Sequence, residues 1–355
     1  MCRALQIAAR GRGQTTPNPM VGAIVADGDG AIVATGYHAR AGDAHAEIVA
    51  LMGAGARARG ATLYCTLEPC CHHGRTGPCV EAIVQAGIVR VVAPTEDPNP
   101  LVSGGGVRYL RAHGVRVDLG VCEAEARRLN EAFFTSVVRG RPFVIAKVAT
   151  SLDGRIASAP GHRTRLSSAP VNRLMQRQRA EVDAVGVGVG TVLADDPALT
   201  VREVFRRRPL VRVVFDSGLR TPTDARVLDA GDRGPCLIVS TEEAVRARPG
   251  VADALTRRGA TIVTPPTRDI ASALGALQRF DVQTLLLEGG AALHRSAFMA
   301  GVVDKVQMVV CDRILGPDAV PWVDVETFAT TDLIDRTTQV WGPDLVIEGY
   351  VHRTH

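Results

Sequence analysis

The stretch that decides the fold of this 355-residue chain reads His45-Ala46-Glu47 and continues with Glu68-Pro69-Cys70-Cys71-His72-His73-Gly74-Arg75-Thr76-Gly77-Pro78-Cys79. His45, Cys70 and Cys79 offer one nitrogen and two sulfur ligands, a donor set that zinc prefers. Three protein ligands leave a fourth tetrahedral position for water, as in catalytic zinc sites. Glu47 follows the histidine by two residues and supplies a carboxylate for general acid–base catalysis. The pattern therefore predicts a catalytic zinc site in which Glu47 carries protons.

The sequence around each ligand predicts which element holds it. His45 precedes apolar residues at helical spacing over 48–52, so we expect it at the start of a helix. Residues 61–67 are largely β-branched, aromatic and apolar, which is typical of a strand that ends just before the second ligand. Pro78 suits the first position of another helix, where its missing N–H has no partner anyway, so Cys79 falls in the opening turn. A helix start also stabilises a thiolate.

Two other interpretations of the cysteines stay open at this point. They are a closed structural zinc site and buried cysteines without a metal. The histidine and glutamate at a helix start favour the catalytic site, because neither alternative requires that carboxylate. Cys71, His72 and His73 are further candidate ligands, which we interpret as loop residues near a substrate.

The rest of the N-terminal half alternates between helix and strand patterns. Two apolar runs, 21–26 and 31–35, are joined by Asp27-Gly28-Asp29-Gly30 and predict a hairpin. A nearly continuous apolar run over 88–93 is typical of a buried strand. We further expect a strand at 115–118 and helices at 2–10, 79–86, 105–113 and 122–138. This alternation predicts an α/β sandwich with helices on both faces of one sheet.

A short polar break, Arg139-Gly140-Arg141-Pro142, separates the two halves of the chain. We therefore expect one domain over residues 1–141 and a second over residues 142–355. Strand patterns in the second half recur at 143–149, 183–189, 211–215, 236–240, 260–264, 284–288, 304–311 and 345–350. With helical patterns between most of them, they predict a larger α/β sheet.

Composition and charge argue against several classes of protein. A formal net charge of +4 and an aromatic content of 4% do not suit a nucleic-acid surface, which needs basic patches and stacking rings. No apolar run reaches the length of a membrane span, and residues 1–10 do not resemble a signal peptide. Three of the eight cysteines cluster beside a histidine, which indicates a metal site rather than a disulfide framework. We expect a cytoplasmic protein.

Glycines at strand ends mark candidate ligand sites in the second half. Glu288-Gly289-Gly290 joins an apolar run to a helical pattern, an arrangement that binds phosphates but is equally an ordinary tight turn. The segment from Gly186 to Thr191, followed by Asp195-Asp196-Pro197, by itself indicates only a glycine-rich strand end and a turn. Arg206-Arg207-Arg208 precedes a proline, and we expect a solvated loop there.

The metal motif resembles that of the zinc-dependent nucleobase deaminases, in which His and two Cys hold zinc and the Glu moves protons. Their usual pattern is Pro-Cys-x-x-Cys, whereas here eight residues, Cys71 to Pro78, separate the two cysteine ligands. With this longer loop, the motif resembles the deaminase half of the bifunctional riboflavin-biosynthesis deaminase–reductases. The strings Thr-Pro-Asn-Pro-x-Val-Gly, Gly-Tyr-His-x-x-Ala-Gly and Asp-Pro-Asn-Pro match that family as well. The resemblance implies a cytidine-deaminase-like α/β/α domain, in which the Asn18 region and loop 71–77 border the substrate pocket.

The second half resembles the reductase half of the same family. The matching strings are Lys147-x-Ala149-x-Ser151-Leu-Asp153-Gly-Arg155, Gly190-Thr191-Val-Leu-Ala-Asp195-Asp196-Pro197-x-Leu199-Thr-x-Arg202, Phe215-Asp216-Ser217 and Glu288-Gly289-Gly290. The resemblance implies a dihydrofolate-reductase-like α/β domain that uses NADPH. It implies that NADPH contacts Ala149, Thr191, Asp195, Ser217 and the segment Gly290, Ala291, Ala292, Leu293, His294, Arg295 and Ser296. It also implies that the ribose phosphate side of the substrate contacts Arg179, Leu199, Arg202 and Glu288.

Two arginines depart from the family's pattern Gly-x-Ser-x-Trp-Ile-Thr, which here reads Gly161-His162-Arg163-Thr164-Arg165-Leu166-Ser167. Arg165 replaces an aromatic residue beside the cofactor, and we expect it to contact NADPH because arginine also stacks on rings. Arg163 replaces a small serine that contacts the substrate. It either gains a phosphate contact or fills the pocket, and we count it among the substrate-binding residues.

The resemblance as a whole implies two reactions. The first is zinc-dependent hydrolytic deamination of a 2,5-diamino-6-ribosylamino-4(3H)-pyrimidinone 5′-phosphate, and the second is reduction of its ribosyl group to ribityl with NADPH. One alternative is a deaminase whose second half is a non-catalytic binding or oligomerisation module, motivated by Arg163 and Arg165. Another is a nucleic-acid deaminase, which the composition argues against. We expect Zn²⁺ and NADPH as cofactors, and a phosphorylated pyrimidine and further copies of the chain as partners, with neither nucleic acid nor membrane.

Overall fold

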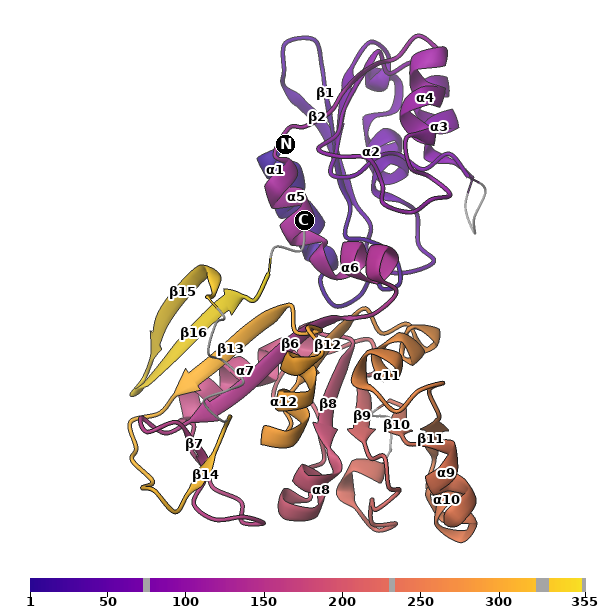
Figure 1. Ribbon diagram of the computed structural model, residues 1–355. Coiled ribbons are helices and arrows are strands. Elements are labelled where there is room, and N and C mark those ends of the chain that lie inside the picture. The colour runs from indigo at the N-terminus through magenta and orange to yellow at the C-terminus, as the bar shows by residue number, and fades with distance from the viewer. Residues whose placement is uncertain (73–76, 230–233, 324–331, 353–355) are drawn as a thin grey trace. The chain divides into compact units, whose positions relative to one another are not determined.

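A computed structural model describes residues 1–72, 77–229, 234–323 and 332–352, and the chain divides into two compact units (Figure 1). The first unit ends at Arg139 and the second begins at Gly140, within the polar stretch 139–142. Each unit has its own sheet and its own hydrophobic core.

The first unit is built on a five-stranded sheet in the order β2-β1-β3-β4-β5. The strands are β1 (Gly22–Ala26), β2 (Ile32–Tyr37), β3 (Thr62–Cys65), β4 (Arg90–Val92) and β5 (Arg116–Asp118). β1 and β2 form the expected hairpin, and β1 also pairs antiparallel with β3. β3, β4 and β5 run parallel, so their carboxyl ends share one edge of the sheet.

Helices cover both faces of this sheet, as the sequence predicts. α2 (Ala46–Ala54), α3 (Cys79–Gln85) and α4 (Gly105–Ala112) pack on the face that carries Val25 and Leu63. α1 (Cys2–Ala8) packs on the opposite face against Ile24. Short 3₁₀ turns follow α1 and α2 at Ala9–Gly11 and Gly55–Ala58.

The single helix expected over 122–138 is wrong, because the chain forms two helices there. They are α5 (Glu123–Leu129) and α6 (Glu131–Arg139), separated at Asn130. The buried Asn130 side chain accepts a hydrogen bond from the Met20 backbone N–H at 2.8 Å and donates one to the Met20 carbonyl at 2.9 Å. Asparagine tends to leave helices to make such contacts, which explains the break.

The second unit is built on a nine-stranded sheet in the order β11-β10-β9-β8-β12-β6-β13-β16-β15. Seven strands are parallel: β6 (Phe143–Thr150), β8 (Ala184–Gly188), β9 (Val211–Phe215), β10 (Cys236–Val239), β11 (Ala260–Val263), β12 (Thr284–Leu287) and β13 (Lys305–Val310). β16 (Asp344–Tyr350) and β15 (Ile334–Trp341) complete one edge in antiparallel pairing. The parallel strands are buried on both faces and therefore read as continuous apolar runs.

Helices cover both faces of this sheet too (Figure 1). α11 (Ile270–Ala276) and α12 (Ala291–Met299) pack on one face. The other face carries α7 (Ala169–Glu181), α8 (Val189–Asp195), α9 (Glu242–Ala247) and α10 (Pro249–Arg257). Further short elements are the 3₁₀ turns Arg226–Leu228 and Gln278–Phe280 and the small pair of strands β7 (Arg155–Ala157) and β14 (Val320–Pro321).

The solvated loop expected at Arg206-Arg207-Arg208 is wrong for two of the three arginines. The Arg206 guanidinium donates to the carbonyls of Arg179, Ala180 and Val182 at the C-terminal end of α7, at distances of 2.9, 2.8 and 2.6 Å. Arg208 pairs with the buried carboxylate of Asp183. Because helix ends leave carbonyls without partners, Arg206 caps α7.

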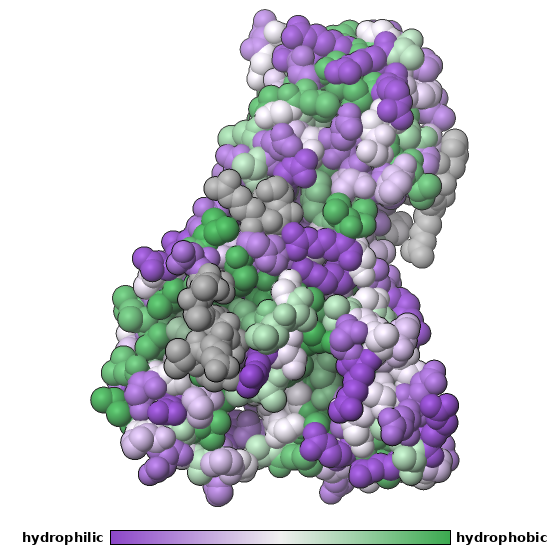
Figure 2. All heavy atoms as spheres, viewed as in Figure 1, coloured by the Kyte–Doolittle hydropathy of each residue, from purple (hydrophilic) through white to green (hydrophobic). Residues whose placement is uncertain are grey.

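On the face in Figure 2, hydrophobic residues lie in small groups between hydrophilic ones over both units. Among the described residues, none of the helices is both long and apolar enough to span a bilayer.

Candidate active sites

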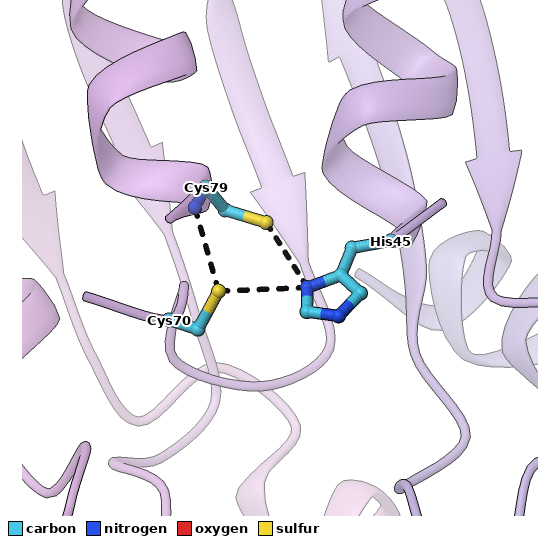
Figure 3. Close-up of side chains that lie close together, drawn as sticks. All are labelled: His45, Cys70 and Cys79. Atoms are coloured by element: carbon cyan, nitrogen blue, oxygen red, sulfur yellow. Dashed lines mark hydrogen bonds between the residues drawn. The ribbon is translucent and has the colours of Figure 1, made fainter. Parts of the chain in front are cut away.

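The three expected metal ligands converge in the first unit (Figure 3). His45 is the N-cap of α2 and Cys79 is the first residue of α3, while Cys70 lies in the loop after β3. The His45 Nδ1 atom lies 3.3 Å from the Cys79 Sγ and 3.5 Å from the Cys70 Sγ. Ligands bound to a tetrahedral zinc are about 3.5 Å apart, so the donor set and its spacing fit zinc.

The two thiols are electrostatically unequal. The hydrogen bond with the Cys79 thiol, together with one from His45, lowers the pKa of Cys70 to about 4. The same contact and burial raise the pKa of Cys79. The Cys79 backbone N–H at the start of α3 also donates to the Cys70 Sγ at 3.4 Å. Thiolates are the metal-binding form of cysteine, so this arrangement prepares the site for a cation.

Glu47 lies in the first turn of α2, two residues after His45, and only 4% of it is exposed. Burial raises its pKa to about 7, and the negative charge of Cys70 adds to the effect. A carboxyl group with a pKa near neutrality both accepts and donates protons readily, as general acid–base catalysis requires.

Glu68 holds the loop that carries Cys70, a role that the sequence reasoning missed. Its buried carboxylate accepts hydrogen bonds from the backbone N–H groups of Asp97, Gly104 and Val107, at 3.0, 2.9 and 3.0 Å. A Cβ on Gly106 would lie 2.0 Å from the Pro69 carbonyl oxygen, so this close approach requires glycine. The carboxylate therefore joins the ligand loop to the start of α4. The signal in the sequence was a glutamate directly before Pro-Cys.

His38 is a second polar residue beside the metal site that the sequence reasoning did not single out. Its ring meets the His45 ring edge to face, with centroids 5.5 Å apart. Burial lowers the pKa of His38, so the ring is neutral. Nδ1–H donates to the Ala44 carbonyl at 3.2 Å, which leaves Nε2 to accept from the Asn18 side-chain amide at 3.0 Å. Asn18, which the family resemblance assigns to the pocket border, is therefore linked through His38 to His45, the expected ligand.

The other candidate ligands are placed apart from this triad. The Cys71 Sγ lies 3.9 and 4.0 Å from the carbonyl oxygens of Val102 and Leu101. His72 is half-buried, and His73 lies outside the described residues.

The second unit contains a cavity of about 850 Å³ at the carboxyl ends of the central strands. Most of the residues expected to bind NADPH line it: Ala149, Arg165, Thr191, Asp195, Gly290, Ala291, Ala292 and Leu293. The backbone N–H of Gly290 donates to the Thr191 hydroxyl at 3.2 Å, which joins the start of α12 to that of α8. Burial raises the pKa of Asp195.

The remaining expected NADPH contacts do not line this cavity. Ser217 lies on an exposed turn, and its carbonyl accepts a hydrogen bond from Thr241. His294 is fully buried, with Nε2 bonded to the Leu287 carbonyl at 3.0 Å and Nδ1 bonded to the Trp322 indole N–H at 2.8 Å. Arg295 and Ser296 are exposed on α12.

The residues expected to bind the substrate surround an adjoining cavity of about 610 Å³, which is lined by Arg163, Arg179, Leu199, Arg202 and Glu288. The two cavities share several of these residues. Arg179 and Glu288 form a two-pronged ion pair with N–O distances of 2.7 and 2.5 Å. The other arginines that line this cavity, Arg163, Arg165, Arg202 and Arg226, are more exposed. Lys147 also lines the larger cavity, and burial lowers its pKa.

Comparison with known proteins explains why two such sites occur in one chain. A family model of the RibD C-terminal domain matches residues 142–347, and one of the cytidine and deoxycytidylate deaminase zinc-binding region matches residues 1–95. The chain is 42% identical over 313 residues to the riboflavin biosynthesis protein RibD of Aquifex aeolicus, covering 88% of this chain and 86% of that protein. The chain belongs to the RibD family.

Other RibD proteins match over similar lengths. The Escherichia coli protein is 38% identical over 335 residues, covering 90% of this chain and 88% of that protein. A solved structure of Acinetobacter baumannii RibD is 34% identical with a TM-score of 0.87, over 98% of this chain and 97% of that one. A Thermotoga maritima structure, described as a diaminohydroxyphosphoribosylaminopyrimidine deaminase and 5-amino-6-(5-phosphoribosylamino)uracil reductase, is 34% identical with a TM-score of 0.84, over 99% and 97% of the two chains. The expected cytidine-deaminase-like and reductase folds are confirmed.

Proposed function

We propose that residues 1–141 deaminate a 2,5-diamino-6-ribosylamino-4(3H)-pyrimidinone 5′-phosphate and that residues 142–355 then reduce its ribosyl group to ribityl. Family membership makes the chain a bifunctional enzyme of riboflavin biosynthesis, with a zinc-dependent deaminase and an NADPH-dependent reductase. The observation that carries the assignment of residues is the convergence of His45, Cys70 and Cys79 beside a buried Glu47.

In the deaminase, Glu47 moves the protons. His45, Cys70 and Cys79 would hold a zinc ion, which would supply a Lewis acid that lowers the pKa of water to about 7. Glu47 would accept a proton from the attacking water as its oxygen adds to the amino-bearing ring carbon, and would then donate a proton to the leaving ammonia. Burial raises the pKa of Glu47 to about 7, which suits a carboxyl group that must both accept and donate a proton.

In the reductase, the two cavities divide the binding between cofactor and substrate. When bound, NADPH would supply the hydride that reduces the opened ribose carbon. The Gly290 start of α12, where backbone N–H groups and the helix dipole favour anions, would hold its phosphates. Arg165 would contact the cofactor from the larger cavity, and Arg163 and Arg202 would bind the substrate phosphate from the adjoining one. The ion pair between Arg179 and Glu288 holds the lining that the two cavities share in place.

The two alternatives are not favoured. A non-catalytic second half does not explain why the reductase family model matches residues 142–347 and why the cavity there is lined by the expected residues. A nucleic-acid deaminase does not explain the attached reductase half. We propose that the partners are a phosphorylated pyrimidine and further copies of the chain, in the cytoplasm, without nucleic acid or membrane. Light scattering after size-exclusion chromatography tests the oligomeric state.

The experiment that tests the proposal measures ligands on one purified sample. Elemental analysis should find about one zinc per chain, and calorimetry should find about one NADPH per chain. Loss of zinc binding in Cys70→Ser with NADPH binding unchanged would support separate sites. NADPH binding without any zinc in wild type would contradict the deaminase assignment, and zinc without NADPH binding would contradict the reductase assignment.

A further inference from the structure

Cys2 and Cys122 bring two thiols together on the surface of the first unit, outside both sites described above. Their Sγ atoms lie 3.6 Å apart, although the residues are 120 positions apart in the sequence. Cys2 is exposed and Cys122 is half-exposed, whereas Cys65, Cys236 and Cys311 are buried. We propose that Cys2 and Cys122 form a reversible disulfide that fastens α1 to the start of α5.

The short distance between the sulfurs favours bond formation. A disulfide has an S–S distance of about 2.05 Å, so the sulfurs must approach by about 1.5 Å. Cys2 opens α1 and Cys122 caps α5, and the two helices are in contact. Cys2 is the more exposed of the two thiols, so the oxidant reaches it first, and the hydrogen bond with Cys2 raises the pKa of the Cys122 thiol.

The chemistry requires an oxidant, and a low-molecular-weight disulfide such as oxidised glutathione serves. The Cys2 thiolate attacks one glutathione sulfur and releases one reduced glutathione. Cys122 then loses its proton and attacks the Cys2 sulfur of the mixed disulfide, which releases the second reduced glutathione. Two protein thiols thus lose two electrons and two protons, and oxidised glutathione gains them.

The bond would act on a short helix. α1 has seven residues, and only Ala4, Ile7 and Ala8 of them are buried. Its backbone packs on β1, where a Cβ on Gly22 would lie 2.2 Å from the Ala4 carbonyl oxygen. The chain continues from α1 to Gly11, whose Cβ would lie 2.8 Å from the His38 carbonyl oxygen. A disulfide on α1 would therefore restrain the segment that leads to Asn18, whose side chain bonds to His38 beside the proposed metal site.

The test uses zinc-loaded, full-length protein treated with oxidised glutathione under native conditions. Peptide mass spectrometry should find a Cys2–Cys122 link that dithiothreitol removes, with about one zinc retained per chain. Hydrogen exchange at α1 should slow about tenfold or more, and the first unit should melt about 5–15 °C higher, because the bond closes a very long loop.

Cys122→Ser is the matched control, because it keeps Cys2 but removes the resolving thiol. It should stop at a glutathione adduct on Cys2, with no change in α1 exchange, and Cys2→Ser should show neither product. Both reduced variants should deaminate like wild type, since neither residue touches the metal site. Only a glutathione adduct in wild type, or a link between two chains through Cys2, would overturn the proposal. A Cys2–Cys122 link that leaves hydrogen exchange at α1 unchanged would overturn the proposal that the bond fastens α1.

Discussion

The zinc site and the reductase cavity are built in different ways from one chain. The proposed zinc ligands lie within residues 45–79, at two helix starts and one strand exit, and the His45 Nδ1 atom lies 3.3 and 3.5 Å from the two sulfurs. The reductase cavity is lined by residues from Lys147 to Val320, which approach one another only when the nine-stranded sheet is complete. A compact motif at helix starts fixes its own geometry. A cavity at strand ends depends on the packing of a whole domain, so single residues in it matter less.

The sharpest test of this difference removes one zinc ligand. Cys79→Ser should lose zinc and all measurable deamination, because two ligands do not hold the ion in place. Reduction of separately supplied deaminated intermediate should continue, because the second unit has its own core. Metal analysis and the two separate assays measure this. Cys71→Ser is the matched control, and a loss of zinc there would mean that the wrong cysteine has been assigned.

Removing the proton carrier should have the next largest effect. Glu47→Gln keeps shape and burial but cannot carry protons, so deamination should fall by about 10²–10⁴-fold or more while zinc is retained. Steady-state rates and metal content on the same sample measure both. Retention of more than about a tenth of wild-type activity would show that another group carries the protons.

A smaller effect is expected where the cavity depends on distant packing. Arg206→Gln removes the cap from α7, whose Arg179 pairs with Glu288, and should lower the free energy of unfolding of the second unit by about 1–3 kcal/mol. We also expect a higher KM in the reductase with unchanged deamination. Urea unfolding and reductase kinetics measure these effects. Arg207→Gln is the control, because Arg207 is exposed and should change stability by about 0.5 kcal/mol at most. If the two variants lowered the free energy of unfolding equally, Arg206 would not act as the cap of α7.

The smallest effect is expected at the two unusual arginines. An arginine over a ring contributes about 0.5–2 kcal/mol, so Arg165→Trp should change NADPH affinity only modestly. Arg163→Ser should act mainly on the KM for the substrate, because Arg163 also lines the adjoining cavity. Calorimetry with NADPH and reductase kinetics separate the two. If the wild type neither binds NADPH nor reduces the intermediate, and the variant that carries both substitutions does both, the second half of the wild-type chain is not a working reductase.

The sequence patterns predict where most strands lie, but they do not predict which segments are held in the sheet by pairing alone. All eight strands expected in the second half are present, because most of them are apolar runs buried on both faces. β15 was missed because six of its eight residues are exposed, so backbone pairing with β16 holds a segment without an apolar pattern. β7 and β14 are too short to show any period.

The same limit applies to the sites. The spacing of His45, Cys70 and Cys79 predicts a triad that the structure brings together. Glu68 was missed because its partners lie up to 39 residues away and are backbone groups, which leave no mark in the side-chain pattern. His294 follows the glycines in the sequence, yet its ring is buried against Trp322. Only the first turn of α12 lines the cavity, and His294 lies beyond the residues that do.

We propose that the two sites of this chain act in sequence. The most direct test of that order is mass spectrometry of the products formed from the diaminopyrimidinone phosphate, with and without NADPH. Without NADPH, the deaminated ribosylamino compound and ammonia should accumulate. With NADPH, the ribityl product should form as the coenzyme is oxidised. No ammonia in either sample, or the same product in both, would rule out two successive reactions.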